Sequence, residues 1–173
     1  KVLIGCPTGI MAYGFPYNKV GRYLVGNVDY QKVAQGFYDF YSTYRYPYGT
    51  IGITKTSELD ALAAVMKEIN GRFTFNPSQL NSVQRMDGYT PVIFFDMGDY
   101  VSKLCTDATL LAKFQACLER AVPAATALHT DYYYSSSMGQ VLINTYSGMT
   151  ISDPSTSSKA TGKAETAWYK ATH

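Results

Sequence analysis

The chain has 173 residues, 46% of them apolar, which suits one globular domain or a large piece of one and excludes a disordered protein. Fifteen basic and thirteen acidic residues are scattered along it and give a formal net charge of +2. This argues against a nucleic-acid-binding protein, which needs a basic patch to neutralise phosphates. No apolar run approaches the roughly 20 residues of a membrane-spanning helix, and sixteen tyrosines with only 16% charged residues favour a protein outside the cytoplasm.

The first element is a short apolar run. Val2–Gly5 predicts a strand buried on both faces. The prolines and glycines that follow predict a loop over residues 6–17. Because free chain ends usually fray, we expect a chain that opens in a core strand to be a portion of a larger protein.

Two helices are the clearest elements of the first half. One is predicted from an N-cap at Asn27 or Asp29 to about Tyr44. The other has a long apolar stripe, a capping box at Ser57 and a closing Gly71.

Strands and helices alternate through the rest of the chain, which favours an α/β sandwich with a mainly parallel sheet. The other expected elements are a strand at 50–54, a helix at 78–84, a strand at 92–95, helices starting at Asp96 or Asp99 and at Thr106 or Asp107, strands at 124–130, 141–144 and 149–152, a Ser- and Thr-rich loop at 152–162, and a short terminal helix carrying Trp168.

The three cysteines, Cys6, Cys105 and Cys117, are too few for a disulfide scaffold and lack the spacing of a zinc site. Gln115–Cys117 matches the residues that end at the caspase nucleophile, but the residues that follow depart from that signature and no His lies upstream. Cys117 falls on the apolar stripe of a helix, so we predict that it belongs to the core.

Cys6 follows a predicted strand, at the position where open α/β sheets build their sites. A thiolate there could react if a base approached, and His129 is the plausible internal base. The alternative is that Cys6 lines a pocket or the core without reacting.

Asp96 and Asp99 suggest a calcium loop, but the full ligand pattern is missing, and helix capping explains both side chains. The chain also lacks a phosphate-binding lysine loop and a serine-hydrolase elbow. We therefore expect no metal site and no cofactor, with calcium lacking a recognisable site. From the residues alone, no catalytic constellation is complete.

The opening loop carries the most informative pattern. Gly5–Tyr17 resembles a segment of the clostripain-like cysteine peptidases, bacterial enzymes with a caspase-like fold. Asp96–Tyr100, Ser147–Pro154 and Glu165–Thr172 resemble three further elements of that family, in the same order. The resemblance implies a caspase-like three-layer sandwich, with residues 1–173 supplying the carboxyl-terminal half of one peptidase domain.

The family places its catalytic His and its Asp-x-Cys motif before the stretch that opens this sequence. The resemblance therefore implies a heavy chain whose His/Cys dyad lies on an upstream light chain, retained after proteolytic processing as a heterodimer. It implies a secreted or cell-envelope bacterial enzyme that acts on peptides or proteins. No catalytic role then falls to the cysteines or histidines present, namely Cys6, Cys105, Cys117, His129 and His173.

The resemblance also implies a role for the loop after the first strand, which would form a wall of the pocket for the residue before the scissile bond. The substrate-binding residues expected here are Gly5, Cys6, Pro7, Thr8, Tyr13 and Gly14. Cys6 replaces the usual Ser, Gly9 the usual Glu, and Tyr13 an Asp found in relatives that bind Lys or Arg. A Lys/Arg preference, an inactive paralogue and a non-catalytic module that binds glycans or surface polymers all remain open alternatives.

Overall fold

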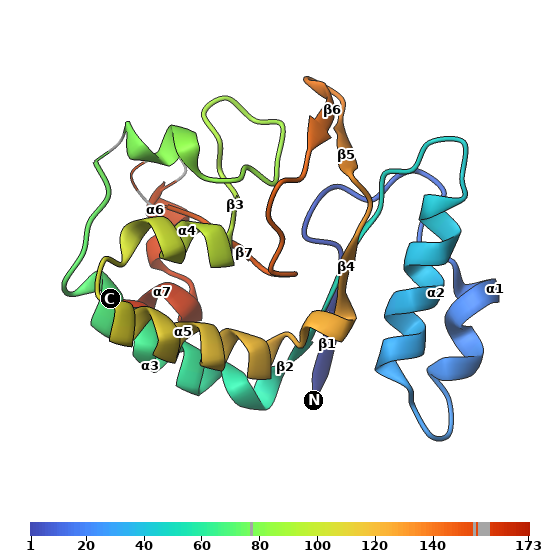
Figure 1. Cartoon of the computed structure of the whole chain (residues 1–173), viewed down its shortest axis with the longest axis horizontal. Coiled ribbons are helices and arrows are strands. Elements are labelled where there is room, and N and C mark those ends of the chain that lie inside the picture. The colour runs from blue at the N-terminus through green and yellow to red at the C-terminus, as the bar shows by residue number, and fades with distance from the viewer. Residues whose placement is uncertain (77, 154, 156–159) are drawn as a thin grey trace.

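The structure is a computed structural model that describes residues 1–76, 78–153, 155 and 160–173. Figure 1 shows a small sheet in the middle, two helices on one side of it and a larger group of helices on the other. This is the mixed α/β architecture expected from the sequence. None of the described helices has the length and hydropathy needed to cross a membrane.

The central sheet has three strands, with β2 in the middle and antiparallel to both neighbours. Two smaller antiparallel pairs lie beside it. The strands are β1 (Val2–Gly5), β2 (Thr50–Lys55) and β4 (Ala127–His129) in the central sheet, β3 (Phe95–Asp96) with β7 (Thr150–Ile151), and β5 (Tyr132–Ser135) with β6 (Gly139–Leu142).

The expected mainly parallel sheet is not confirmed, because every strand pair in the described part of the chain is antiparallel. β1 and β4 run in the same direction, but β2 lies between them and runs opposite to both. Alternation of strands and helices along a sequence shows that strands are separated by crossovers, but it does not show the order of the strands in the sheet.

Helix α2 (Tyr30–Ser42) confirms the helix predicted from Asp29. The Asp29 carboxylate accepts a hydrogen bond from the Lys32 N–H at 3.0 Å, which satisfies a free donor of the first turn. α2 and the short α1 (Tyr17–Val20) cover one face of the sheet. Between them lies the first core cluster, formed by Val20, Val33, Ala34, Phe37, Tyr41, Ile51 and Ile53.

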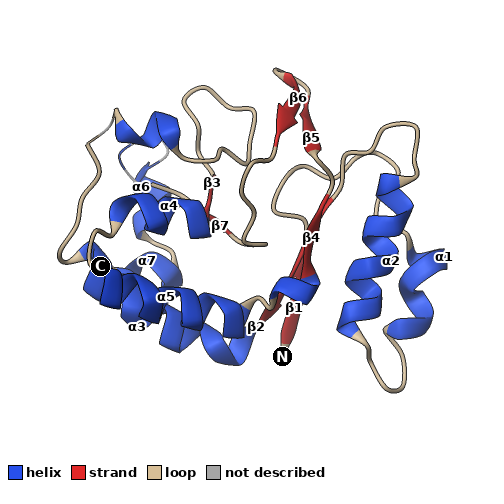
Figure 2. Ribbon diagram, viewed as in Figure 1, coloured by secondary structure: helices blue, strands red, loops and turns tan. Residues whose placement is uncertain are grey.

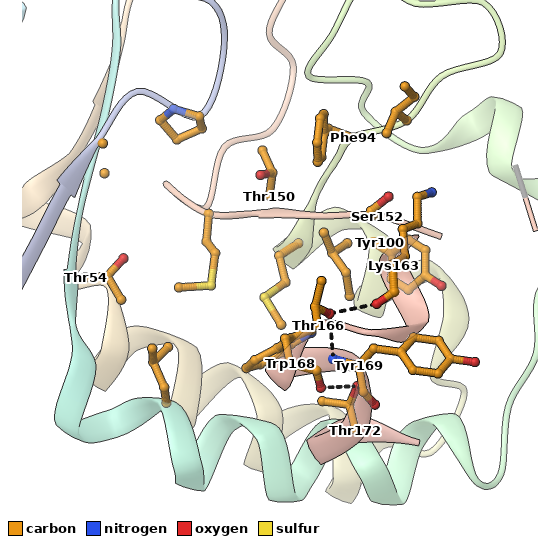
Figure 3. A pocket seen from close by; sticks show the side chains of 18 of the residues that line it. Thr54, Phe94, Tyr100, Thr150, Ser152, Lys163, Thr166, Trp168, Tyr169 and Thr172 are labelled. Atoms are coloured by element: carbon orange, nitrogen blue, oxygen red, sulfur yellow. Dashed lines mark hydrogen bonds between the residues drawn. The ribbon is translucent and has the colours of Figure 1, made fainter. Parts of the chain in front are cut away.

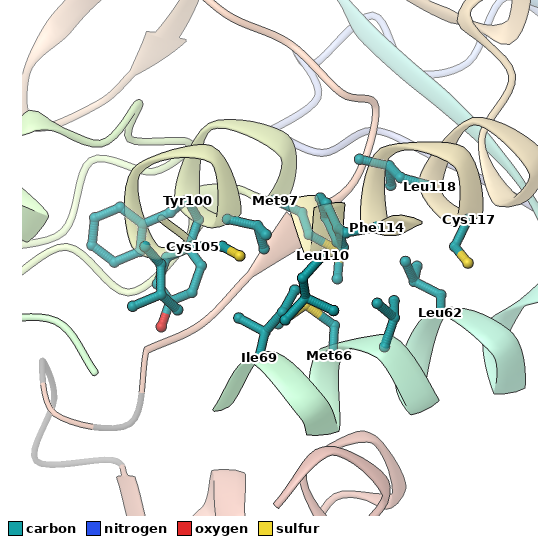
Figure 4. Close-up of a cluster of buried hydrophobic side chains, with 14 of the residues drawn as sticks. Leu62, Met66, Ile69, Met97, Tyr100, Cys105, Leu110, Phe114, Cys117 and Leu118 are labelled. Carbon is teal, nitrogen blue, oxygen red and sulfur yellow. The ribbon is translucent and has the colours of Figure 1, made fainter. Parts of the chain in front are cut away.

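The second core cluster lies on the other side of the sheet (Figure 4). It is enclosed by α3 (Leu59–Asn70), α4 (Met97–Leu104) and α5 (Ala108–Ala121), and its members include Leu62, Met66, Ile69, Tyr100, Phe114 and Leu118. The expected capping box at Ser57 is wrong. Residues 56–58 form the 3₁₀ turn η2 (Thr56–Glu58), and the residue before α3 makes no side-chain cap.

Three predicted elements are shorter than expected. The helix at 78–84 is only the 3₁₀ turn η3 (Gln79–Ser82), and the strand at 124–130 opens with the 3₁₀ turn η4 (Ala124–Thr126). The strand at 92–95 contracts to β3 because the N–H groups of Ile93 and Phe94 donate to the Asp87 carboxylate instead of to a strand, at 2.8 and 2.5 Å.

The carboxyl-terminal segment folds as α6 (Ala160–Ala164) and α7 (Ala167–Thr172), which confirms the terminal helix carrying Trp168. Asn70 Nδ2 on α3 donates to the Thr172 carbonyl at 3.0 Å and holds α7 against α3. The predicted loop at 152–162 and Pro154 of the third matching stretch lie partly or wholly outside the described residues.

Candidate functional site

Loops gather at the end of the sheet where β1 ends (Figure 2). Beside them, on the side of the sheet that faces α7, opens a cleft of about 760 Å³. Figure 3 shows Thr54, Phe94 and Trp168 around it, each contributed by a different part of the chain. Most of its lining is apolar, with Leu3, Leu59, Ile93, Met97, Met149 and Ile151 among the contributors.

Gly5, Cys6 and Pro7 of the predicted substrate loop line this cleft. Gly5 pairs with Gly52 of β2, so the loop leaves the sheet at a point without side chains. A Cβ added at Gly52 would lie 1.9 Å from the Gly148 carbonyl oxygen, which explains the glycine at that position. The backbone of the loop therefore faces the cleft directly.

Thr8 supports the loop instead of lining the cleft. Its side chain is buried, its hydroxyl lies 2.8 Å from the Thr50 hydroxyl, and its N–H donates to the same oxygen at 3.2 Å. These bonds fasten the loop to the first residue of β2. Thr8 thus positions Cys6 and Pro7 without displaying its own side chain.

Gly14 lies against α2 and Tyr13 against Tyr44, two residues after the end of α2, and neither lines the cleft. The Tyr13 ring packs on Tyr44 with centroids 4.1 Å apart. Gly14 has φ +70°, a conformation that favours glycine, and its carbonyl accepts the Tyr41 hydroxyl at 2.9 Å. The structure therefore divides the predicted site residues into a group at the cleft and a group on α2.

The environment of Cys6 is that of an unreactive thiol. Burial raises its pKa to about 11, so the side chain is protonated at neutral pH. The observed contacts of His129 are with other groups: its Nδ1 lies 2.9 Å from the Thr130 carbonyl oxygen, and its ring packs on Tyr146 with centroids 4.7 Å apart. A reactive Cys6 served by His129 is not supported.

The other two cysteines belong to the second core cluster, which confirms the predicted core position of Cys117. Cys117 Sγ accepts a hydrogen bond from Arg120 Nη2 at 3.2 Å, and Cys105 Sγ donates to the Asp107 carbonyl at 3.5 Å. The match to the caspase nucleophile is thus a coincidence of sequence.

Asp96 confirms the prediction of a helix cap. Its Oδ1 accepts from the Asp99 N–H at 2.9 Å, and its Oδ2 accepts from the N–H and hydroxyl of Ser147 at 2.6 and 2.8 Å. Burial raises the pKa of this carboxyl despite those donors. Within the described residues no group of three or more His, Cys, Asp or Glu side chains is arranged to hold a metal ion.

Two features at the cleft were missed from sequence. The Asp87 carboxylate also accepts the Tyr89 N–H at 2.8 Å and so shapes a loop that brings Tyr89 and Phe94 to the cleft. An Asp-Gly pair is a turn signal, so the motif at Asp87 could have been found. Asp153 accepts the Tyr100 hydroxyl at 2.7 Å, a buried contact between segments that no local pattern indicates.

Comparison with solved structures gives the family. A clostripain from Bacteroides thetaiotaomicron, solved with the peptide inhibitor BTN-VLTK-AOMK, is 60% identical to this chain with a TM-score of 0.95, and the match covers 99% of this chain and 76% of that one. This chain belongs to the clostripain-like C11 cysteine proteases. The family predicted from the sequence is therefore confirmed. No family model and no curated protein sequence matches the chain.

Other C11 proteases match over the same extent. A secreted C11 cysteine protease from B. thetaiotaomicron, "iotapain", shows 60% identity and a TM-score of 0.95, but this chain spans only 48% of its length. An inactive zymogen C11 protease from Parabacteroides distasonis shows 29% identity and a TM-score of 0.82, with 99% of this chain and 51% of that one covered. The chain thus spans from about half to about three quarters of these relatives.

Proposed function

We propose that this chain is the heavy-chain portion of a secreted or cell-envelope bacterial cysteine endopeptidase whose His/Cys dyad lies on an upstream light chain. The observation that carries the proposal is the 60% identity to two C11 proteases that extend beyond the matched region. One of those relatives is described as secreted. Cys6, whose thiol is protonated at neutral pH because burial raises its pKa, supports a nucleophile elsewhere.

The open side of the sheet supports a missing partner segment. Leu3 points away from the first core cluster and is 61% exposed, although it sits within a strand. β1 pairs with β2 along one edge and, among the described residues, with no strand along the other. An apolar cleft beside an unpaired strand edge is a surface that proteins normally cover. The upstream light chain is the proposed cover.

The loop at Gly5–Pro7 is the proposed contact with substrate. Strand-end N–H and C=O groups can pair with an extended peptide. The upstream thiolate would attack the scissile carbonyl, and its His would donate a proton to the departing amine. Water would then hydrolyse the thioester, with backbone N–H groups holding the oxyanion. This chemistry needs no cofactor, so we propose that none is bound.

A preference for Lys or Arg before the scissile bond has one line of support, the relative solved with an inhibitor whose name contains VLTK. Tyr13 offers no carboxylate to a cationic side chain, and it does not line the cleft. The Asp of the upstream Asp-x-Cys motif is the proposed charged partner. Burial of Phe37, Tyr41 and Phe114 in the core leaves the glycan-binding alternative with less support.

The test is intact mass of the natural full-length gene product under native and denaturing conditions. A second chain that carries Asp-x-Cys and dissociates only on denaturation is the expected result. Fluorogenic Lys, Arg and neutral peptides, assayed with and without a chelator, then give the specificity and the metal requirement. A single species of this chain alone, with no peptidase activity, would overturn the proposal.

A further inference from the structure

A second groove, of about 660 Å³, lies on the opposite side of the sheet from the cleft. It runs between α2 and the segment formed by α1 and the 3₁₀ turn η1 (Gly21–Tyr23), which lie side by side in Figure 1. Lys19, Arg22 and Tyr23 form one wall.

The other wall is a stripe on α2. Its residues recur every three or four positions, Phe40 among them also packs against the first core cluster, and the last is the C-cap of α2: Lys32, Gln35, Gly36, Asp39, Phe40 and Thr43. A Cβ at Gly36 would lie 2.8 Å from Val20 Cγ1, so glycine lets α1 approach α2 closely. The groove is therefore a built feature of the α1–α2 contact.

One end of the groove is cationic. The guanidinium carbon of Arg22 lies 4.7 Å from the centre of the Tyr23 ring, and Arg22 Nη2 donates to the Tyr23 hydroxyl at 2.6 Å. Lys32 Nζ lies 5.7 Å from the centre of the same ring. Asp29 pairs with Lys32 at 3.2 Å, whereas no ion pair between described residues involves Arg22 or Lys19. The amino terminus of α2 adds a partial positive charge at this end.

The other end is aromatic and reaches the proposed substrate loop. The Phe40 and Tyr44 rings lie 5.5 Å apart, and Tyr44 packs on Tyr13. Asp39 also lies here, with its carboxylate accepting from Gln35 Nε2 at 2.7 Å. The groove thus carries the Asp39 carboxylate and aromatic rings at the end near Tyr13, and cationic side chains at the end near Arg22.

We propose that this groove is an exosite that binds an acidic segment of a polypeptide substrate, at a distance from the scissile bond. The inference rests on the proposed function, because it takes Gly5–Pro7, in the same loop as Tyr13, to contact substrate. Acidic side chains of the segment pair with Arg22 and Lys19, and an apolar side chain packs on Phe40 and Tyr44. The carboxylates of Asp29 and Asp39 make the groove a poor site for a continuous polyanion such as nucleic acid.

The test uses the natural full-length protein and fluorogenic peptides that share one cleavable core. The core is extended on either side by a Glu-rich tail or by a matched Gln-rich tail. The ratio of kcat/KM for the Glu peptide to that for the Gln peptide is expected to be about three to ten on one side of the core, as a few exposed ion pairs would give. The ratio should fall toward one at high salt.

Charge variants locate the effect. The double variant Lys19→Glu with Arg22→Glu should bring the ratio to one or below, and Arg22→Lys should retain part of it. The single variant Arg22→Glu should lower the ratio in part, and Lys67→Glu, an equal charge change on the exposed face of α3, is its matched control and should leave the ratio unchanged. A ratio near one in the unaltered protein, or a ratio that Lys67→Glu lowers equally, overturns the exosite.

A separate binding measurement distinguishes this failure from failure of the proposed function. If no core peptide is cleaved, the peptidase proposal fails, and fluorescence anisotropy of a labelled Glu-rich peptide tests the groove alone. Tighter binding to the unaltered protein than to the double variant supports an acidic-peptide site. Equal binding overturns it.

Discussion

The two faces of the central sheet are covered to different extents. On the α1–α2 face, Val20, Val33 and Ile51 are completely buried, and the helices close over the strands. On the other face the cleft opens beside β1, and Leu3 is exposed. Both faces belong to the same strands, so the difference comes from what covers them.

This difference indicates which side of the chain is self-sufficient. Alternate residues of β1 point to opposite faces, so Val2 and Ile4 pack on the first core cluster while Leu3 borders the cleft. An apolar side chain on the open face contributes to stability only if another segment covers it. The closed face should therefore set the stability of this chain, and the open face its association.

The largest effect is expected on the closed face. Phe37→Ala removes a side chain that is 1% exposed and packs between Phe15 and Tyr41, so it should lower the free energy of unfolding by about 3–5 kcal/mol. Chemical denaturation of the full-length protein measures it. Tyr17→Ala, at a position 70% exposed, is the control and should change stability by less than about 0.5 kcal/mol. Similar losses from both variants would mean that the first core cluster does not stabilise the fold as described.

On the open face, a substitution should instead weaken association with the proposed light chain. Leu3→Asp places a charge on the open face of the sheet, where the proposed light chain would have to bury it unpaired. We expect the second chain to be weakened or lost in native mass spectra, with activity falling in parallel. Val25→Asp is the matched control, since Val25 is an apolar residue with 69% exposure in the loop after η1. Retention of a tightly bound second chain in Leu3→Asp would place the light-chain interface elsewhere.

Much of the closed face could be predicted from sequence because its signals are local. The spacing of Val33, Phe37 and Tyr41 gives one side of a helix, and Asp29 supplies the cap that starts it. The direction of β2 could not be predicted, since it depends on how the chain returns after α2. The β5–β6 hairpin was also missed, because three consecutive tyrosines hide an alternation in which only Tyr133 is buried.

The site was predictable to a similar extent. The strand end and the family resemblance led to Gly5–Pro7, which do line the cleft. Tyr13 and Gly14 were grouped with them because they belong to the same stretch that resembles the family, but the positive φ of Gly14 and the Tyr41 hydrogen bond hold this part of the loop on α2. Asp87 acts through backbone donors up to seven residues away, a relation that spacing rules for side chains do not reveal.

The smallest effect is expected at the boundary between the two faces, at Cys6. Because burial raises its pKa to about 11, only about one thiol in a thousand is ionised at pH 8. Alkylation by iodoacetamide, located by peptide mass mapping, should be slow at neutral pH and accelerate as pH rises toward 11. The buried Cys105 and Cys117 should stay unlabelled while the protein is folded. Cys6→Ser, which introduces the residue expected at this position from the family resemblance, should leave kcat/KM nearly unchanged. Rapid labelling of Cys6 at pH 7, with activity lost in proportion, would make this chain the source of the nucleophile and remove the need for a dyad on another segment.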